Sequence, residues 1–280
     1  MSQLRVNSIR HTGALSDAIE LATDGTCTAK ITNNLSNRRI NINGAMNIAQ
    51  RAVSVTGCTL SAYRTCDRQQ LGLNNLGTWT VTQESNGPDG FSNSFKALCT
   101  TADGSPNASD SAVYFHHIEA QDLQQLAYGT SNAKAMVLSF WVKSNKTGNA
   151  TLELQQYDNS DKRVTPQYSI SSANTWEKKT ISITGDTSGV INNDNGTGLR
   201  LGWWLNSGST YTGGSHRSTW TANDNTDRNV SNLGVGGAVN DYFQITGVQL
   251  EIDSTGSGVA TDFEHRSYGD ELARCQRYYG

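Results

Sequence analysis

The chain has 280 residues, a length that fits one large all-β domain or one domain with a small extension, and a formal net charge of -3. It contains no basic stripe of the kind that binds nucleic acid and no run of about 18 apolar residues that would span a membrane. Apolar residues make up 35% of the chain, below the ~45–50% of typical globular proteins. This composition favours thin layers with polar loops, or a chain that buries surface against copies of itself.

Residues 1–36 are predicted to form a small β-rich stalk or attachment segment. Two short alternating stretches, residues 19–21 and 27–31, flank Asp24-Gly25, which predicts a hairpin with a type I′ turn. So small a unit cannot bury a core of its own and is expected to pack against a neighbour. The first seven residues lack the apolar stretch of a secretory signal, so the protein is expected to stay in a cytosol until it is released.

Residues 37–280 are predicted to form one head domain of short strands separated by Gly, Asn and Ser turns. The expected strands are residues 40–42, 78–82, 112–115, 136–142, 151–157, 176–183, 198–205 and 242–252. Residues 136–142 are apolar on both faces and should form a central strand. This order of elements predicts an all-β fold, an antiparallel jelly-roll β-sandwich.

Two irregularities are predicted within the head. Residues 117–126 are expected to form one or two helical turns anchored by Ile118, Leu123 and Leu126. The apolar pattern of residues 242–252 changes phase at Thr246-Gly247, and an extra residue at such a point is a β-bulge.

The loop 206–232 is the most suggestive part of the chain for binding, because it is long and has no apolar pattern of its own. Its rings and hydrogen-bonding groups suit a carbohydrate, since a ring face covers the C–H side of a pyranose while acids and amides hold the hydroxyls. The candidate glycan-binding residues are Tyr211, His216, Trp220, Asp224 and Asp227, with Tyr211 and Trp220 as stacking platforms. The alternative is structural: Trp220 packs on Trp203 as a strand residue, and the rest of the loop makes a subunit contact.

No catalytic motif is present, and the chain is predicted not to be an enzyme. His116 and His117 are adjacent, so on one strand their rings would face opposite sides and make poor joint metal ligands. A glycan hydrolase with paired carboxylates stays open as an alternative, with Asp224 and Asp227, or Asp158 and Asp161, as the pairs.

No metal or cofactor is predicted. Residues 192–196 and 158–161 offer the oxygen ligands that calcium uses, but neither completes an EF-hand, and Asx turns explain both. The odd number of cysteines, 5, and the absence of a C-x-x-C pair argue against zinc and favour free thiols, although a Cys58–Cys66 bridge is sterically conceivable.

The last twenty residues carry a helix start signal. Ser267 and Asp270 have capping-box spacing, after which Tyr268, Leu272, Cys275 and Tyr279 recur at helical intervals. This short C-terminal helix is expected to dock on the head. The predicted structural residues of the tail are Phe263, Tyr268 and Leu272 as buried side chains, Glu264 and Arg266 as ties of the turn, and His265 as a hydrogen-bonded anchor.

Three stretches of the chain resemble parts of known phage proteins. The tail, FEHRSYGDELARCQRYY, resembles the C-terminal signature of virion proteins from tailed bacteriophages, above all marine and cyanobacterial podoviruses. Residues 39–51 resemble the N-x-x-I-N-G-x-x-x-x-A-Q-R opening of the same domains, and residues 6–31 are similar to fibre segments that intertwine in trimeric stalks.

The resemblance implies a virion structural protein, a homotrimeric tail fibre with a jelly-roll head that binds a host surface glycan. Its expected partners are copies of itself, other virion proteins through the N-terminal segment and, at the head, the host glycan, with no nucleic acid and no membrane. Its expected location is the virion, assembled in the host cytoplasm. The alternatives are a capsid-decorating or head-fibre protein and a glycan-degrading tailspike hydrolase.

Overall fold

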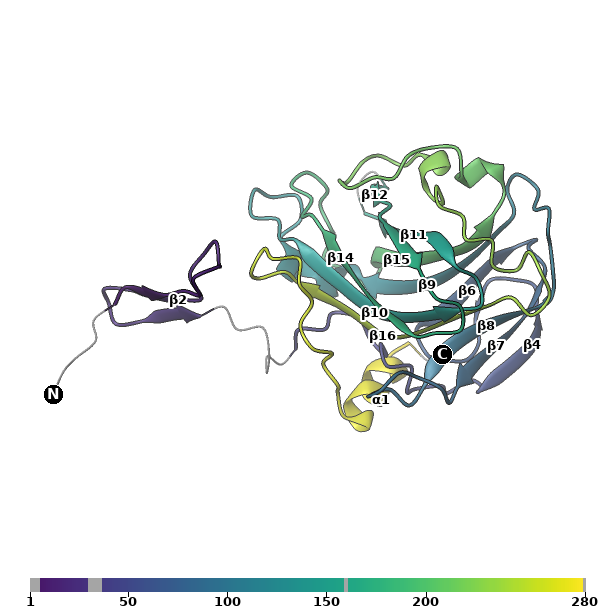
Figure 1. Ribbon diagram of the computed structural model, residues 1–280, viewed down its shortest axis with the longest axis horizontal. Helices are drawn as coiled ribbons and strands as arrows, with labels where there is room; N and C mark the ends of the chain where they lie inside the picture. Colours follow the sequence, from purple (N-terminus) through teal and green to yellow (C-terminus); the bar gives the residue numbers. More distant parts are fainter. Residues whose placement is uncertain (1–5, 30–36, 159–160, 279–280) are drawn as a thin grey trace.

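The computed structural model describes residues 6–29, 37–158 and 161–278 of the chain. The fold is an antiparallel β-sandwich of jelly-roll type, as the sequence predicts, in which two large sheets pack face to face (Figure 1). Within the described residues, no helix is long and apolar enough to cross a membrane.

A small sheet near the N-terminus is separate from the two large sheets (Figure 1). It consists of β1 (Ser8–Ile9), β2 (Ile19–Leu21) and β3 (Cys27–Ala29), and β2 and β3 form the predicted hairpin. The prediction of a type I′ turn is wrong. The connection between β2 and β3 spans five residues, and of Asp24 and Gly25 only Gly25 has a positive φ. The Asp24 carboxylate instead accepts hydrogen bonds from the Thr26 backbone and hydroxyl, which stabilises a wider turn.

The first large sheet has six strands among the described residues. Their order across the sheet is β14 (Glu177–Ile183), β10 (Met136–Ser144), β16 (Tyr242–Ile252), β8 (Ser94–Thr101), β7 (Thr78–Glu84) and β4 (Ser54–Cys58). The predicted interior position of residues 136–142 is confirmed, because β10 lies between β14 and β16. The predicted bulge is also confirmed: the register of β10 and β16 shifts between Ser139 and Trp141, opposite Thr246-Gly247, and Gly247 has a φ of +60°.

The second large sheet has seven strands in the part of the chain that the structure describes. Six of them follow one another in the order β12 (Arg163–Val164), β11 (Gly148–Gln156), β15 (Thr197–Ser207), β9 (Ser111–Glu119), β6 (Gln69–Asn74) and β5 (Ala62–Tyr63). The seventh, β13 (Gln167–Ile170), also pairs with β11. The predicted helical turns follow β9 as a short 3-10 helix, η1 (Ala120–Leu126), in which Leu123 and Leu126 are buried.

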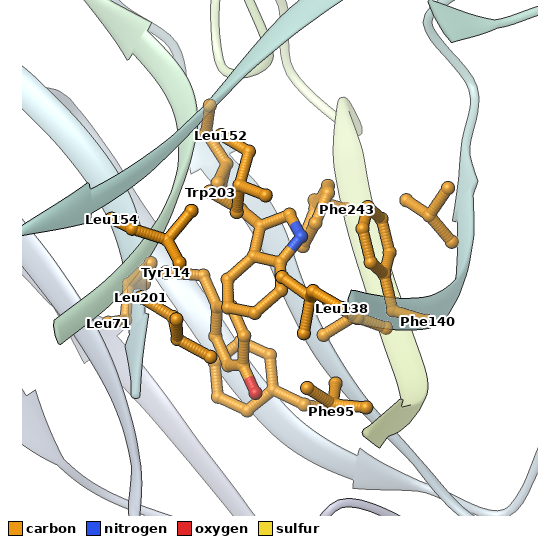
Figure 2. Close-up of a cluster of buried hydrophobic side chains, with 14 of the residues drawn as sticks. Leu71, Phe95, Tyr114, Leu138, Phe140, Leu152, Leu154, Leu201, Trp203 and Phe243 are labelled. Carbon is orange, nitrogen blue, oxygen red and sulfur yellow. The ribbon is translucent and has the colours of Figure 1, made fainter. Parts of the chain in front are cut away.

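The core lies between the two large sheets and is rich in aromatic rings (Figure 2). Trp203 and Tyr114 from the seven-stranded sheet meet Phe140 and Phe243 from the six-stranded sheet, with ring centroids 5.2 to 6.2 Å apart. All four side chains are at most 1% exposed. Burial of a large ring contributes ~2–3 kcal/mol through removal of apolar surface from water, so this layer holds the sheets together.

Residues 37–50 do not form the predicted strand at 40–42. They run beside β16 without regular pairing: the Ile40 amide donates to the Leu250 carbonyl, and the Asn41 side chain bonds the backbone of Val248 and Leu250. Gly44 lies so close to the Val248 carbonyl that a Cβ there would come within 2.0 Å of its oxygen. The side chain of Asn41 thus takes over bonds that a strand backbone would make, which alternation of apolar residues does not signal.

The C-terminal helix α1 (Tyr268–Gln276) begins at Ser267, whose hydroxyl accepts a hydrogen bond from the Asp270 amide at 3.2 Å, as predicted. Its docked face differs from the prediction. Cys275 is buried against Ile42 and Ile48 with Leu272 beside it, whereas Tyr268 is 64% exposed. Tyr279 lies outside the described residues.

A buried ion pair also holds the helix against the head. The Glu271 carboxylate pairs with Arg39 and accepts a hydrogen bond from the Asn43 amide at 2.5 Å. Because an unpaired buried charge costs several kcal/mol, Glu271 and Arg39 stabilise each other only when Glu271 faces inward. Tyr268, in the first turn of α1, stays exposed. A charged residue at an inward position is a signal that apolar spacing misses.

The segment before α1 is tied down as predicted. The Glu264 carboxylate accepts hydrogen bonds from the Asn37 and Arg39 amides, and Arg266 donates to the carbonyls of Arg39 and Asn41. His265 packs against two rings instead of making the predicted hydrogen bond. Its ring centroid lies 5.2 Å from that of Phe91 and 4.8 Å from that of Phe263. Phe263 is only half-buried.

All five cysteines are free thiols, so Cys58 and Cys66 form no bridge.

Candidate functional site

The outer face of the seven-stranded sheet carries rings and charges where a solvent-facing sheet surface normally carries small polar residues. Side chains alternate between the two faces of a strand. On β15, Leu201 and Trp203 therefore enter the core, while Arg200, Gly202 and Trp204 face outward. Outer-face residues are thus fixed by the strand register.

The register aligns outward-facing residues into a row across five strands. Tyr63 pairs with Gln70, Gln70 with Phe115, Phe115 with Gly202, and Gly202 with Glu153. With strands ~4.8 Å apart, this row is ~19 Å long. His117, Arg200, Gln155 and Arg163 form a second row beside it.

Phe115 lies flat on the sheet because glycines flank it on both neighbouring strands. A Cβ on Gly72 would come within 2.5 Å of the Phe115 ring, and one on Gly202 within 3.0 Å. Any side chain at these two positions would push the ring away from the sheet. The two glycines therefore make room for an aromatic floor on the outer face.

Arg200 lies between two rings. Its guanidinium carbon is 4.1 Å from the centroid of the Phe115 ring and 5.1 Å from that of Tyr157, which follows β11. Such stacking is attractive because ring faces carry negative charge, and it is worth ~0.5–2 kcal/mol per contact. The Arg200 side chain keeps 13% of its surface exposed. The guanidinium thus reaches the surface only at the edge of a ring stack.

His117 links the rings of the outer face. Its ring centroid lies 6.5 Å from that of Tyr63, 6.2 Å from Phe115 and 6.2 Å from Tyr157. Burial, together with the charges of Arg200 and Arg68, lowers the pKa of His117 to about 4. The imidazole is therefore neutral at pH 7, with one nitrogen that donates and one that accepts. We call Tyr63, Phe115, His117 and Tyr157 the aromatic row.

The two tyrosines of the aromatic row are its exposed members. Tyr157 is 42% exposed and Tyr63 36%, against 9% for Phe115. Partial burial raises the pKa of both phenols, which therefore keep their protons near neutral pH. Beyond Tyr63, a cavity of about 190 Å³ extends towards Arg68 and Tyr278. The row thus offers ring faces together with hydroxyl donors.

The Glu153 carboxylate pairs with three arginines at the other end of the outer face. It is 1% exposed, and its carboxylate lies 2.8 Å from Arg228 Nε, 2.9 Å from Arg163 Nε and 3.9 Å from Arg200 Nη2. Although burial acts in the opposite direction, Arg228, Arg163 and Arg200 together lower the pKa of Glu153. The carboxylate is therefore charged and anchors all three cations to the sheet.

The loop 206–232 covers the Trp204 end of this face (Figure 1). Tyr211, in the short 3-10 helix η2 (Ser209–Tyr211), packs on Trp204 with ring centroids 5.0 Å apart. Arg228 stacks on both rings, 5.0 Å from Trp204 and 5.5 Å from Tyr211. Of the predicted glycan-binding residues, Tyr211 is thus the one that joins the outer face.

Two other predicted residues hold the loop in place. His216 bonds Thr165 O through Nδ1 at 2.7 Å and Ser231 Oγ through Nε2 at 2.8 Å. Asp227 is 5% exposed, accepts a hydrogen bond from the Ser215 amide and pairs with Arg217. Both ring nitrogens of His216 and both oxygens of Asp227 are therefore already occupied.

Trp220 and Asp224 also make structural contacts. The Trp220 indole donates to the Thr184 carbonyl at 2.7 Å and packs on Tyr128, with ring centroids 5.8 Å apart, so it does not pack on Trp203 as the structural alternative assumed. Asp224 caps η3 (Asn225–Asp227) by accepting from the Thr226 amide. Because η2 and η3 contact each other, the structure brings Tyr211 and Asp227 together, with Asp224 beside them, whereas Trp220 is bound at Thr184. The glycan-binding role of the loop stays a prediction.

A second cavity lies beside the loop. It has a volume of about 240 Å³ between the β12–β13 turn, the end of β14 and the loop, and its lining includes Val164, Pro166, Ile183, His216 and Arg217. Its walls are mainly apolar, with Arg217 and His216 at the loop side. This cavity is the place where the predicted loop contributes to a concave surface.

The acidic residues proposed for hydrolysis and for calcium binding accept hydrogen bonds from neighbouring residues of the protein. Hydrogen bonds from the Thr226 hydroxyl and amide lower the pKa of Asp224, whereas a general acid needs a raised pKa. Asp158 accepts two hydrogen bonds from Asn192, which joins the two turns named for calcium. Among the described residues, no group of three or more His, Cys, Asp or Glu side chains has metal-binding geometry.

The aromatic row was missed because its members come from three separate stretches of sequence. Tyr63, Phe115 and Tyr157 are each unremarkable in their own strands. The available signal was the pattern of outward-facing residues: a ring at Phe115 and a glycine at Gly202 on predicted strands, with Gly72 in a stretch where no strand was predicted. Reading that pattern requires the strand order, which alternation alone does not provide.

No protein-family model matches the chain, and no curated protein matches it. Solved structures similar to it include carbohydrate-binding modules and a phage tailspike domain. The tailspike match, the enzymatically active domain of tailspike protein 4 of bacteriophage CBA120, is 13% identical with a TM-score of 0.38, over 76% of this chain and 21% of that one.

Two further matches cover nearly all of the other chain. A putative sugar binding protein from Bacteroides thetaiotaomicron is 13% identical with a TM-score of 0.42, over 77% of this chain and 100% of that one. The C-terminal family 22 carbohydrate-binding module of Clostridium thermocellum Xyn10B is 9% identical with a TM-score of 0.38, over 79% of this chain and 98% of that one. Similarity at this level assigns no function, and membership of the podovirus family remains a prediction.

Proposed function

We propose that the protein binds a carbohydrate on the outer face of its seven-stranded sheet, and that the sandwich is the head of a phage tail fibre. The observation that carries the first part is the aromatic row, which lies beside Arg200 and Gln70. Ring faces cover the apolar side of a pyranose, and the neutral His117, the two phenols and the amide of Gln70 suit its hydroxyls. These groups lie on a face whose paired row from Tyr63 to Glu153 is ~19 Å long, enough for several sugar rings.

The affinity of one such site for a glycan is expected to be low, near millimolar, which corresponds to about -4 kcal/mol. Several heads on one fibre would then raise the effective affinity, because the second contact becomes intramolecular. Binding without cleavage is part of the proposal.

The test is affinity electrophoresis of the full chain through gels that contain host-type polysaccharides, followed by chromatography of the glycan. Retarded migration of the native but not the heat-denatured protein, with the glycan intact, supports the proposal. Unretarded migration in every polysaccharide would contradict it. Shortened glycan chains would instead favour the hydrolase.

The tail-fibre part of the proposal is supported by the N-terminal sheet and by the sequence of the tail. Ile9 and Leu21 of the small sheet are 53% and 43% exposed, and Leu15, between β1 and β2, is fully exposed. Strands of two or three residues are too short to be stable alone. Packing of three copies about a common axis would cover these side chains. The fibre is therefore proposed to be a homotrimer within the virion.

Light scattering of the full chain should give three times 30.3 kDa. A stable monomer at micromolar concentration would contradict the trimer without affecting the binding face. The position of the protein in a density map of the whole particle would distinguish a tail fibre from a capsid-decorating protein.

A further inference from the structure

The outer face holds more positive than negative charge at its centre. Around Glu153 stand three arginines, Arg163, Arg200 and Arg228, and the other acid of the cluster is Asp161, which is 3.2 Å from Arg163 Nη2. Three cations therefore face two carboxylates.

These charges are poorly solvated, which makes their balance important. The side chains of Arg163, Arg200 and Arg228 are 6%, 13% and 14% exposed, and that of Glu153 is 1% exposed. A charge pair in such surroundings interacts more strongly than one in water. An anion brought to this face would meet a cation that the protein itself has not neutralised.

The three arginines differ in how closely they are bound to Glu153. Arg228 donates to its carboxylate through Nε at 2.8 Å and Nη2 at 3.2 Å, and Arg163 Nε lies 2.9 Å from it. Arg200 approaches only to 3.9 Å, and its Nη2 donates to the neutral Gln155 side chain. Arg200 is therefore the arginine whose charge is least neutralised.

Several arginine donors on this face also lack acceptors. In the described part of the chain, Arg163 Nη1 and Arg200 Nε are buried without a hydrogen-bond partner. Arg163 is 95% buried, at 5% exposure, and a buried donor without a partner is costly. Glu153, Asp161 and Gln155 therefore satisfy these guanidiniums only in part.

Arg200 is also placed where a carbohydrate on the aromatic row would lie. Its guanidinium stacks between Phe115 and Tyr157, and Arg200 pairs with His117 across the strands. The planar fork of a guanidinium matches the two oxygens of a carboxylate. A sugar seated over Tyr157 would bring a ring substituent close to this fork.

We propose that the outer face selects an acidic carbohydrate, one whose sugar carboxylate pairs with Arg200 while its ring stacks on Tyr157. This inference rests on the proposed carbohydrate-binding function and names the substrate class of the same face. A carboxylate, from a uronic or a sialic acid, completes the charge balance that Glu153 and Asp161 leave incomplete.

The experiment uses the full chain and matched pairs of oligosaccharides, each an oligomer of a uronic or sialic acid and its methyl ester, which has the same backbone without the charge. Binding is measured by titration calorimetry at fixed ionic strength. A hydrogen bond to a charged group corresponds to at least about a tenfold gain in affinity. The free acid of at least one pair should therefore bind about tenfold or more tightly than its ester.

Substitutions of Arg200 test whether this residue causes the preference for the free acid. Arg200→Gln should remove the preference for the free acid, whereas Arg200→Lys, which keeps the charge, should retain part of it. Arg274→Gln, at an exposed position on α1, serves as the matched control and should bind as the wild-type protein does. Because the comparison of acid with ester is made first on the wild-type protein, it does not depend on any variant folding.

The outcomes separate this inference from the function on which it rests. Equal binding of acids and esters, or better binding of neutral glycans, would overturn the acidic preference and leave carbohydrate binding standing. A preference that survives in Arg200→Gln would overturn the assignment to Arg200. No binding of any glycan by the wild-type protein would overturn both.

Discussion

The two faces of the seven-stranded sheet are built from alternate residues of the same strands, yet they are stabilised differently. On the inner face, Trp203 and Tyr114 contact other apolar rings and are fully buried (Figure 2). On the outer face, their neighbours Trp204 and Phe115 contact arginines. The inner rings exclude water from the core, whereas the outer rings support a charged surface.

The difference shows why rings alone do not identify a binding surface. An inner ring has no exposed edge, so it contributes only to stability. On the outer face, exposure increases from Trp204, at 2%, to Tyr157, at 42%. Only the exposed end of that gradient can meet a ligand, so stability and binding should separate between residues a few positions apart.

The largest expected effect tests the inner face. Trp203→Ala should lower the free energy of unfolding by ~3–5 kcal/mol, because it leaves a cavity between the two sheets. Tyr157→Ala, on the outer face, removes the stacking on Arg200 and should lower it by no more than ~0.5–2 kcal/mol. Urea denaturation of both variants measures the contrast. Similar losses for the two would break the distinction between the faces.

A smaller effect concerns the pH dependence of stability. The pKa of His117 is lowered to about 4 in the folded chain, below its ordinary value of 6.5. The unfolded chain therefore binds the proton first as the pH falls, so this contribution to stability is complete above pH 6.5 and is lost between pH 6.5 and 4. The loss amounts to ~3 kcal/mol at most.

His116 is buried on the inner face, and its pKa is also lowered by burial, so it adds to the loss in the same direction. Unfolding free energies between pH 7 and 4 should therefore fall for the wild-type protein and less steeply for His117→Gln. An unchanged slope in that variant would mean that His117 is more solvated than its ring contacts indicate.

The smallest expected effect concerns the small sheet. Removal of residues 1–36 should leave the melting temperature of the sandwich almost unchanged, because β1, β2 and β3 pair only with one another. It should also abolish assembly, if the exposed side chains of the sheet make the trimer contact. Calorimetry and light scattering of residues 37–280 test the two parts. A large drop in melting temperature would show that the sheet supports the head.

The fold was largely predictable, because alternation, turn residues and a phase change are local signals. The bulge at Thr246-Gly247 and the cap at Ser267 both follow from a few neighbouring residues, and both are confirmed. The docked face of α1 was predicted in part: Leu272 and Cys275 pack on the head, but Tyr268 is exposed, and Glu271 is buried by its pairing with Arg39, 232 positions away. Apolar spacing cannot register so distant a partner.

The site was less predictable than the fold. Loop length and composition predicted a binding role for residues 206–232, but the hydrogen bonds of His216 and Asp227 hold the loop in place. The aromatic row depends on the pairing of β5, β6, β9, β15 and β11, which lie far apart in the chain. Strand order arises from the packing of the whole sandwich, and no single stretch of sequence contains it.

The most direct test of the central claim compares two double variants in glycan binding. Tyr63→Ala/Tyr157→Ala removes the exposed rings of the aromatic row, and Tyr211→Ala/Trp220→Ala removes the rings of the loop. For variants that melt cooperatively, the outer-face account predicts at least a ~tenfold loss of affinity for the first, equal to ~1.4 kcal/mol, and a smaller loss for the second. Undiminished binding by Tyr63→Ala/Tyr157→Ala would contradict the account.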